Sequence, residues 1–303
     1  MSGALDRVAA RLGARARRDV PLGPLTTYRV GGAADVFVVA AELAELRAVA
    51  EAVAGEGVAT LVLGRGSNLL VADAGFHGVA IQLAGDFEAV GVVGTDVTAG
   101  GAASLPVVAR QSAAAGLTGF EWAVGVPGSI GGAVRMNAGG HGSDMAASLR
   151  RVHLVDLATG EDGWVPADRL DLSYRHSSVR ADQVVVAAEL SLAPGDRAAA
   201  EAEISEIVRW RRAHQPGGQN AGSVFTNPPG DSAGRLIEAA GAKGLRIGTA
   251  HVSTKHANFI QADEGGSADD VWRLMQTIQE TVRAASGVIL HPETRLVGFD
   301  PSR

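Results

Sequence analysis

The residues best suited to binding a charged ligand are the glycines of one stretch, residues 116–144. Nine of its 29 residues are glycine, so it cannot form an ordinary helix or strand interior. Apolar residues are interleaved with these glycines, which is typical of a loop packed against a large partner. Ser129, followed by Gly131, Gly132 and Ala133, could begin a helix whose free N–H groups point at a phosphate. A set of tight turns explains the spacing equally well.

A second glycine-rich turn covers residues 64–68 and follows directly after a predicted strand at 58–63. Phosphates often bind at such a position. The G-x-G-x-x-G fingerprint is absent because position 69 is leucine, and the sequence contains no Walker loop. If a dinucleotide binds here, the fold is therefore not a Rossmann fold. A plain turn is the simpler interpretation of these five residues taken alone.

Composition excludes several kinds of site. The chain has no cysteine, which rules out disulfides, thiolate catalysis, iron–sulfur clusters and cysteine zinc sites. Its net charge of -6 gives no general attraction to nucleic acid or anionic membranes. No apolar run approaches the roughly 18 residues that span a bilayer, and the N-terminus lacks the apolar segment of a secretory signal. We expect a soluble cytoplasmic protein with no metal site, no nucleic-acid partner and no membrane insertion.

The elements that must position these loops begin with a compact βαββ unit. Its predicted parts are a strand at 35–39, a helix at 41–55 and strands at 58–63 and 79–83. Further along, apolar patterns predict strands at 87–93, 97–99, 152–157, 184–192 and 258–261. Helical periodicity and capping residues predict helices at 104–115, 198–212, 233–240 and 267–286. Ser104 is the expected cap of the first of these helices, and residues 267–270 resemble a capping box.

Six motifs follow one another along the chain. They are T-T-Y-R-V-G-G at 26–32, L-G-R-G-S-N-L-L at 63–70, G-V-P-G-S-I-G-G-A-V-R-M-N-A-G at 125–139, Y-R-H-S at 174–177, A-G-S-V-F-T-N-P at 221–228 and H-P-E-T-R at 291–295. Residues 233–238 and 256–260 match as well. In this order the motifs resemble the UDP-N-acetylenolpyruvoylglucosamine reductase family, the flavoenzymes that complete UDP-N-acetylmuramate synthesis. The resemblance covers nearly the whole chain.

This resemblance implies an α+β fold of the vanillyl-alcohol-oxidase type, also called the PCMH type, which binds FAD without the Rossmann fingerprint. The implied parts are FAD-binding subdomain 1 at 1–85, joined by 289–303, FAD-binding subdomain 2 at 86–196 and a smaller α+β substrate-binding domain at 197–288. FAD is expected to bind non-covalently. The implied FAD contacts are Gly64, Arg65, Gly66, Ser67, Asn68, Gly125, Pro127, Gly128, Ser129, Gly131, Gly132, Ala133, Arg211 and Arg295.

The implied reaction reduces the vinyl double bond of UDP-N-acetylglucosamine enolpyruvate, with NADPH as co-substrate and electrons passing through FAD. Negative charge then develops at the carbon beside the substrate carboxylate. By motif matching, Arg175 binds this carboxylate and Ser223 delivers the proton. Glu293 is the acidic partner, either protonated or aligning Arg175 or the serine hydroxyl. Both roles of Glu293 stay open.

Four more residues match substrate-contacting positions of the family: Tyr174, His214, Asn227 and His256. His214 departs from the pattern, because many members have a lysine before Q-P for the substrate diphosphate, and the charge of histidine changes near neutral pH. The interval between Ser177 and the strand at 184–192 also leaves no room for the long tyrosine-bearing loop of one branch. The chain is thus similar to the shorter branch of the family, and we expect a monomer.

The biological role implied is peptidoglycan precursor synthesis, and with it cell wall biogenesis, cell shape, cell cycle and cell division. Two alternatives remain at this point. One is another flavin oxidase of the same fold, acting on a lactone or an alcohol. The other is a non-catalytic flavin- or nucleotide-binding module. An oxidase has no need to protonate a carbanion, so a residue constellation of Arg175, Ser223 and Glu293 favours the reductase.

Overall fold

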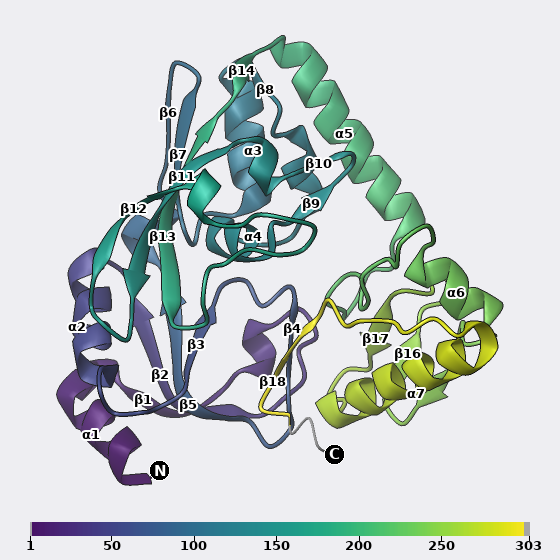
Figure 1. The fold of residues 1–303 in the computed structure, drawn as a ribbon, viewed down its shortest axis with the longest axis horizontal. Coiled ribbons are helices and arrows are strands. Elements are labelled where there is room, and N and C mark those ends of the chain that lie inside the picture. The colour runs from purple at the N-terminus through teal and green to yellow at the C-terminus, as the bar shows by residue number, and fades with distance from the viewer. Residues whose placement is uncertain (1, 300–303) are drawn as a thin grey trace. The chain divides into compact units, whose positions relative to one another are not determined.

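A computed structural model describes residues 2–299, and Figure 1 shows the ribbon. The chain divides into two compact units, each built from three separate segments. Unit 1 consists of Met1–Arg18, Val36–Arg65 and Gly78–Arg211, and unit 2 of Asp19–Asp35, Gly66–His77 and Arg212–Arg303.

The first part of the chain forms the predicted βαββ unit. It consists of β2 (Ala33–Ala40), α2 (Leu43–Val53), β3 (Thr60–Leu63) and β5 (Phe76–Leu83). β3 pairs with β5 in parallel, and with β1 (Arg17–Pro21) these strands form a sheet of order β1-β2-β5-β3. α2 buries Leu46, Val49, Ala50 and Val53, the spacing of one helical face. This face packs in one core with α1 (Ser2–Leu12).

Unit 1 also contains a five-stranded antiparallel sheet of order β12-β11-β13-β7-β6. Its strands are β6 (Val90–Val93), β7 (Asp96–Gly100), β11 (Leu149–Asp156), β12 (Asp162–Pro166) and β13 (Gln183–Ser191). In β13, Val184 and Val186 belong to the core beside α2, whereas Val185 belongs to a second core. This central strand therefore needs apolar residues on both faces, which explains its continuous apolar run.

The second core packs around two helices of unit 1, α3 (Leu105–Ala114) and α4 (Ile130–Met136). Ser104 precedes α3 as predicted, but its side chain makes no capping hydrogen bond, and this expectation was wrong. The strand predicted at 87–93 was also too long, because residues 85–88 form a 3-10 turn that buries Phe87. Short pairs join β8 (Leu117–Thr118) to β14 (Ala193–Pro194), and β9 (Gly139–Gly140) to β10 (Ser143–Asp144). The long helix α5 spans Arg197–His214.

Unit 2 packs α6 (Ala233–Ala239) and α7 (Ala268–Ser286) with a three-stranded antiparallel sheet. The strands are β15 (Arg246–Ile247), β16 (Ala250–Val252) and β17 (Ile260–Ala262). The strand predicted at 258–261 begins two residues later, because Asn258 lies in the preceding turn. Unit 2 also contains a parallel pair that the sequence did not predict, β4 (Leu69–Val71) with β18 (Arg295–Val297).

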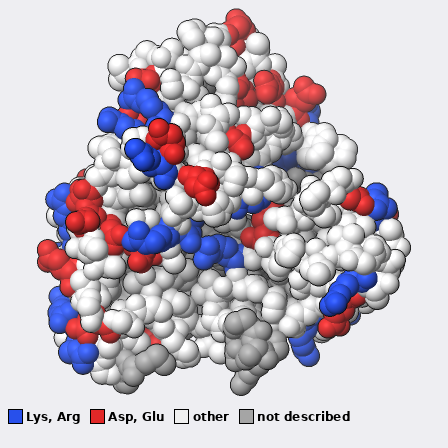
Figure 2. Space-filling model, in the orientation of Figure 1, with Lys and Arg blue, Asp and Glu red and all other residues white. Residues whose placement is uncertain are grey.

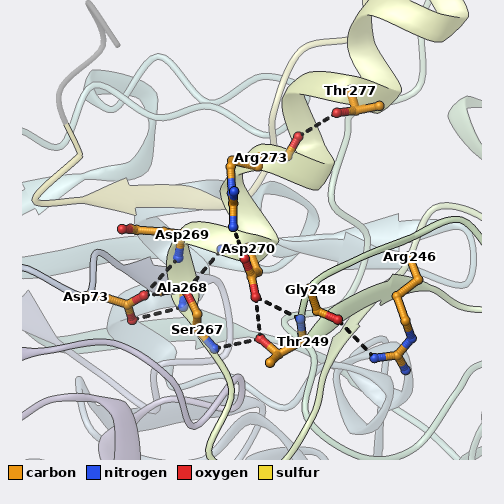
Figure 3. Close-up of polar contacts among 10 residues, drawn as sticks. All are labelled: Asp73, Arg246, Gly248, Thr249, Ser267, Ala268, Asp269, Asp270, Arg273 and Thr277. Atoms are coloured by element: carbon orange, nitrogen blue, oxygen red, sulfur yellow. Dashed lines mark hydrogen bonds and ion pairs between the residues drawn. The ribbon is translucent and has the colours of Figure 1, made fainter.

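Asp73, just after β4, fixes the start of α7. Its Oδ1 accepts a hydrogen bond from the Ala268 amide at 2.9 Å. Its Oδ2 accepts from Ser267 Oγ at 2.5 Å and from the Asp269 amide at 3.2 Å, as Figure 3 shows. A carboxylate here also interacts favourably with the positive end of the helix dipole. The β4 segment and α7 are thereby joined although they are far apart in sequence.

The predicted capping box is only half present. Ser267 Oγ does accept from the Asp270 amide at 3.2 Å. The Asp270 carboxylate, however, accepts from the Thr249 amide and hydroxyl at 2.7 and 2.8 Å, and the Ser267 amide donates to Thr249 Oγ1 (Figure 3). Those bonds from Thr249 lower the pKa of Asp270. The Asp270 carboxylate thus binds the β15–β16 turn to α7 instead of accepting a hydrogen bond from the Ser267 amide. Within residues 2–299, no helix is both long and apolar enough to cross a bilayer.

We predict that Asp73→Ala lowers the free energy of unfolding by about 1–2 kcal/mol, because three donors at the start of α7 lose their acceptor. Urea unfolding followed by circular dichroism measures the change. Asp182→Ala is the control: it removes one exposed ion pair, to Arg180 at 3.0 Å, and should cost less than about 0.5 kcal/mol. Equal midpoints for the two variants would contradict the anchoring role of Asp73.

Candidate active site

The two glycine-rich loops of the sequence meet inside unit 1. Ser129 is the N-cap of α4, and its Oγ accepts from the Gly132 amide at 3.4 Å. A Cβ atom added to Gly64 would lie 2.7 Å from Ser129 Oγ, so any other residue at position 64 would displace the serine. The structure therefore brings together two predicted FAD-binding loops that are distant in sequence.

Several amides at the start of α4 already bond within the protein. The Ile130 amide donates to Ala103 O at 2.9 Å, and the Gly131 amide donates to Gly101 O at 2.8 Å. A Cβ atom on Gly131 would also lie 3.1 Å from that carbonyl oxygen, so this glycine allows close packing of α4. The Ala133 amide donates to Ser129 O. Phosphate contacts by these amides stay a prediction, and they would require exchange of the internal bonds.

Within unit 2, the second half of the Gly64–Asn68 turn joins two other motifs. Gly66 has φ +60°, and a Cβ atom on it would lie 2.4 Å from Leu25 O. The Thr27 amide donates to Gly66 O at 3.1 Å, so the T-T-Y-R-V-G-G motif folds against this turn. Asn68 Nδ2 donates to Glu293 O at 3.1 Å, and the Arg295 amide donates to Asn68 O at 3.0 Å. The H-P-E-T-R motif is thus hydrogen-bonded to the same turn.

Two buried hydroxyls of unit 2 have no hydrogen-bond partner among the described residues: Tyr28 Oη and Thr294 Oγ1. Tyr28 follows Thr27, and Thr294 precedes Arg295, so both are neighbours of residues bonded to the turn at 66–68. A buried polar group without a partner costs about 1–3 kcal/mol, which is typical of a site that a ligand completes. Burial raises the pKa of Tyr28, so its hydroxyl stays protonated and able to donate. These residues fit a polar cofactor such as FAD.

Ser223 and Glu293 lie in adjacent segments of unit 2. The link is Asn258, which is 3% exposed. Its Oδ1 accepts from the Phe225 amide at 3.0 Å, its Nδ2 donates to Phe225 O at 2.8 Å, and its carbonyl accepts from the Val224 amide. Val224 O in turn accepts from the Glu293 amide at 2.8 Å. In the sequence, Asn258 stands out only as part of the matching stretch 256–260. An amide side chain within an apolar run is the signal that could have indicated its structural role.

The substrate-contacting residues predicted in unit 2 lie around the same segments. Asn227 Oδ1 accepts from the Ala233 amide at 3.0 Å, which fixes the loop against the start of α6. His256 Nδ1 accepts from the Asn258 amide at 3.2 Å, and its ring meets Phe259 edge-on at 4.8 Å. His214 ends α5 and is exposed. Their contacts with a substrate stay predictions.

Arg175 lies in a tight turn of unit 1. The Ser173 and His176 backbones exchange two hydrogen bonds, at 3.1 and 3.0 Å, with Tyr174 and Arg175 at the tip. Arg175 has φ +58°, a sparsely populated conformation for a residue with a side chain. Its Nη2 donates to Gly139 O at 3.0 Å, and its guanidinium lies 5.0 Å from the ring centre of Tyr174, which is 58% exposed. The predicted carboxylate-binding residue is thus one of the strained positions of the backbone, as is common at functional sites.

Arg211 lies near the end of α5 in unit 1, and burial lowers its pKa. The neighbouring Trp210 meets the His141 ring edge-on at 5.2 Å. Burial, followed by the charge of Arg211, lowers the pKa of His141. The ring of His141 therefore favours the neutral form beside a permanently charged guanidinium. Arg65 and Arg295, the other predicted FAD-contacting arginines, have exposed side chains in units 1 and 2 respectively.

We predict that the His256 imidazole titrates below its usual pKa of about 6.5. Burial is the larger cause and the charge of Lys243 adds to it, and the ring accepts the Asn258 amide only while Nδ1 is unprotonated. Because the folded-state pKa lies below the unfolded value, this group's contribution to stability is complete above pH 6.5. It is lost as the pH falls toward the folded pKa.

An NMR titration of the histidine ring signals measures this pKa, with His256→Gln used to assign the His256 signal. The variant should also lose less stability than the wild type between pH 7.5 and pH 5.5 in urea unfolding. A His256 signal that titrates above pH 6.5 would contradict the prediction.

Two family models match the chain. The model of the FAD binding domain matches residues 34–162, and that of the UDP-N-acetylenolpyruvoylglucosamine reductase C-terminal domain matches residues 214–297. Among curated proteins, UDP-N-acetylenolpyruvoylglucosamine reductase 2 of Symbiobacterium thermophilum is 41% identical over 95% of this chain and 94% of its own length. The corresponding reductase of Rubrobacter xylanophilus is 41% identical over 97% of this chain and 99% of its own.

A solved structure agrees with these matches. The crystal structure of the UDP-N-acetylenolpyruvylglucosamine reductase from Thermus caldophilus superposes with a TM-score of 0.82 and 35% identity, covering 93% of this chain and 99% of that one. The predicted α+β FAD-binding fold of the vanillyl-alcohol-oxidase type is therefore confirmed. The resemblance of the six motifs to this family is confirmed as well. The chain belongs to the UDP-N-acetylenolpyruvoylglucosamine reductase family.

Proposed function

We propose that this protein is an FAD-dependent oxidoreductase that uses NADPH to reduce UDP-N-acetylglucosamine enolpyruvate to UDP-N-acetylmuramate, a peptidoglycan precursor. The observation that carries the proposal is the hydrogen bond from Asn68 Nδ2 to Glu293 O. It joins a predicted cofactor-binding turn to a predicted catalytic segment within one unit. Through Val224, that segment continues to Ser223.

FAD, when bound, supplies the hydride chemistry that couples NADPH oxidation to reduction of the enolpyruvyl double bond. The residues proposed to hold it are the glycine-rich turns at 64–68 and 125–133. Their glycines allow backbone to approach a ligand closely. Arg211 and Arg295 are proposed to contact the flavin cofactor, and their planar charged groups are each suited to two hydrogen bonds.

Arg175 is proposed to bind the substrate carboxylate. Its guanidinium stays charged at any physiological pH and can pair with both carboxylate oxygens. As hydride adds to the terminal carbon, negative charge grows on the carbon beside that carboxylate, and the guanidinium stabilises it. The hydrogen bond to Gly139 O and the fixed turn limit the directions in which this side chain can point.

Ser223 is proposed to complete the reduction by donating its hydroxyl proton to the carbon beside the carboxylate. The substrate thus gains one hydride and one proton, and NADPH leaves as NADP+. Serine is a poor acid, so this step depends on close placement against a strongly basic carbon. Glu293, in the adjacent segment, is proposed either to align the hydroxyl or to be itself protonated.

The remaining elements of the proposal concern partners and setting. Tyr174, His214, Asn227 and His256 are proposed to contact the substrate, a small molecule like NADPH. A net charge of -6, and charges of both signs interspersed over the face in Figure 2, support the absence of a nucleic-acid partner. We further propose a cytoplasmic monomer with parts at 1–85 plus 289–303, 86–196 and 197–288.

Anaerobic reoxidation of the bound flavin tests the function. The purified protein should be yellow, should bleach on addition of NADPH, and should recover its colour when the enolpyruvyl sugar nucleotide is added without oxygen. Product formation is followed by mass spectrometry. A protein that oxygen reoxidises and the substrate does not would instead be a flavin oxidase, and a protein that cannot bind FAD would be neither.

We predict that Ser223→Ala slows anaerobic reoxidation by the substrate roughly one hundred- to ten thousand-fold, the range for loss of a positioned proton donor. FAD content and the rate of bleaching by NADPH should stay unchanged, because the hydroxyl acts only on the substrate. Ser205→Ala is the matched control, since Ser205 is exposed on α5 and its Oγ donates to Glu201 O at 2.8 Å. Wild-type reoxidation by the Ser223 variant would reject the assignment.

A further inference from the structure

We propose that Asn137 is a positioning residue for Arg175. It ties the turn that carries Arg175 to the end of α4, the helix that begins at the glycine-rich loop. The inference depends on the proposed function, because it adds a support for that function's carboxylate-binding residue. All the residues involved lie in unit 1.

Asn137 is a buried branch point. It is the C-cap of α4, has φ +38° and is 1% exposed. Its Oδ1 accepts from the Ala146 amide at 2.9 Å. Its Nδ2 donates to Asp144 Oδ2 at 3.1 Å and to Ser173 O at 2.9 Å. One side chain therefore joins the end of α4, the segment after β9 and the Arg175 turn.

The carbonyl that Asn137 contacts is the one that closes the turn. Ser173 O also accepts from the His176 amide at 3.0 Å. Both lone pairs of this oxygen are thus engaged, one within the turn and one by Asn137. Arg175, inside the turn, holds a left-handed conformation that persists only where its surroundings enforce it. The bond from Asn137 is the contact best placed to enforce it.

Further hydrogen bonds run between the same two segments in both directions. Arg175 Nη2 donates to Gly139 O at 3.0 Å, and Ser177 Oγ donates to Arg135 O at 2.8 Å. The Arg135 guanidinium in turn donates to Val179 O. Hydrogen bonds on both sides of Asn137 thus hold the end of α4 and the Arg175 turn together. A purely local role as a helix cap would not require a partner in the turn.

The variant Asn137→Gly separates these two roles. Glycine adopts the left-handed C-cap conformation readily, so the end of α4 is preserved while the side-chain bonds are lost. Ser148→Ala is the matched control: Ser148 is buried in the same unit, and its Oγ donates to Gly119 O at 3.3 Å, away from the turn.

The test compares the two half-reactions without oxygen. For Asn137→Gly we expect bleaching by NADPH within twofold of the wild type and reoxidation by the enolpyruvyl substrate slowed about tenfold, equivalent to ~1.4 kcal/mol. Ser148→Ala should change neither rate by more than twofold. In an Arg175→Ala background, adding Asn137→Gly should slow reoxidation no further, because the residue it positions is already gone.

Three results would overturn the inference: equal slowing of both half-reactions, independent effects in the double variant, or unchanged reoxidation by Asn137→Gly. If Asn137→Gly does not fold, Ser177→Ala is used instead, because it removes the neighbouring hydrogen bond to Arg135 O. This variant must slow reoxidation by the substrate but not bleaching by NADPH. In the Arg175→Ala background it must slow reoxidation no further. Wild-type protein that the substrate does not reoxidise would refute the proposed function itself, and the inference would fall with it.

Discussion

The candidate catalytic segment depends on one buried amide, the side chain of Asn258. It bonds to Phe225 in both directions, and its own backbone carbonyl holds Val224. Val224 O then accepts a hydrogen bond from the Glu293 amide, and Asn68 Nδ2 donates one to the Glu293 carbonyl. Removing the Asn258 side chain would leave two buried backbone groups of Phe225 unsatisfied, each costing about 1–3 kcal/mol. The backbone next to Ser223 is thus fixed by this hydrogen-bond network.

In unit 1 the corresponding constraint is the central strand β13. Its alternate valines enter two different cores, so the strand cannot shift by one residue without exchanging its faces. The same strand sets the position of α4, because Gly131 packs against the carbonyl of Val185. The glycine-rich loop is therefore held by a strand that contributes to both cores of the unit. Loops that bind ligands are best positioned when the scaffold beneath them is rigid.

The helices and most strands could be predicted because their signals are local. α7, for example, shows its apolar period and its Ser267 cap in the sequence itself. The catalytic and cofactor residues could be proposed only through ordered motifs, since Ser223 or Glu293 alone is an ordinary loop residue. What could not be predicted depends on partners far away in the chain: Asp73 at the start of α7, the pairing of β4 with β18, and Asn137 at the Arg175 turn. Nothing near these residues in sequence indicates which groups they bind.

The pairing of β4 with β18 has a consequence for how the protein is made. Leu69–Val71 emerges from the ribosome long before its partner strand, Arg295–Val297, has been translated. Until then the early strand has no partner, and the turn before it lacks the Arg295 amide that bonds to Asn68. Chains with such late contacts expose unpaired strand edges during synthesis, the situation that chaperones protect. Unit 2 therefore completes its fold, and the predicted cofactor-binding turn, only after Arg295–Val297 has been translated.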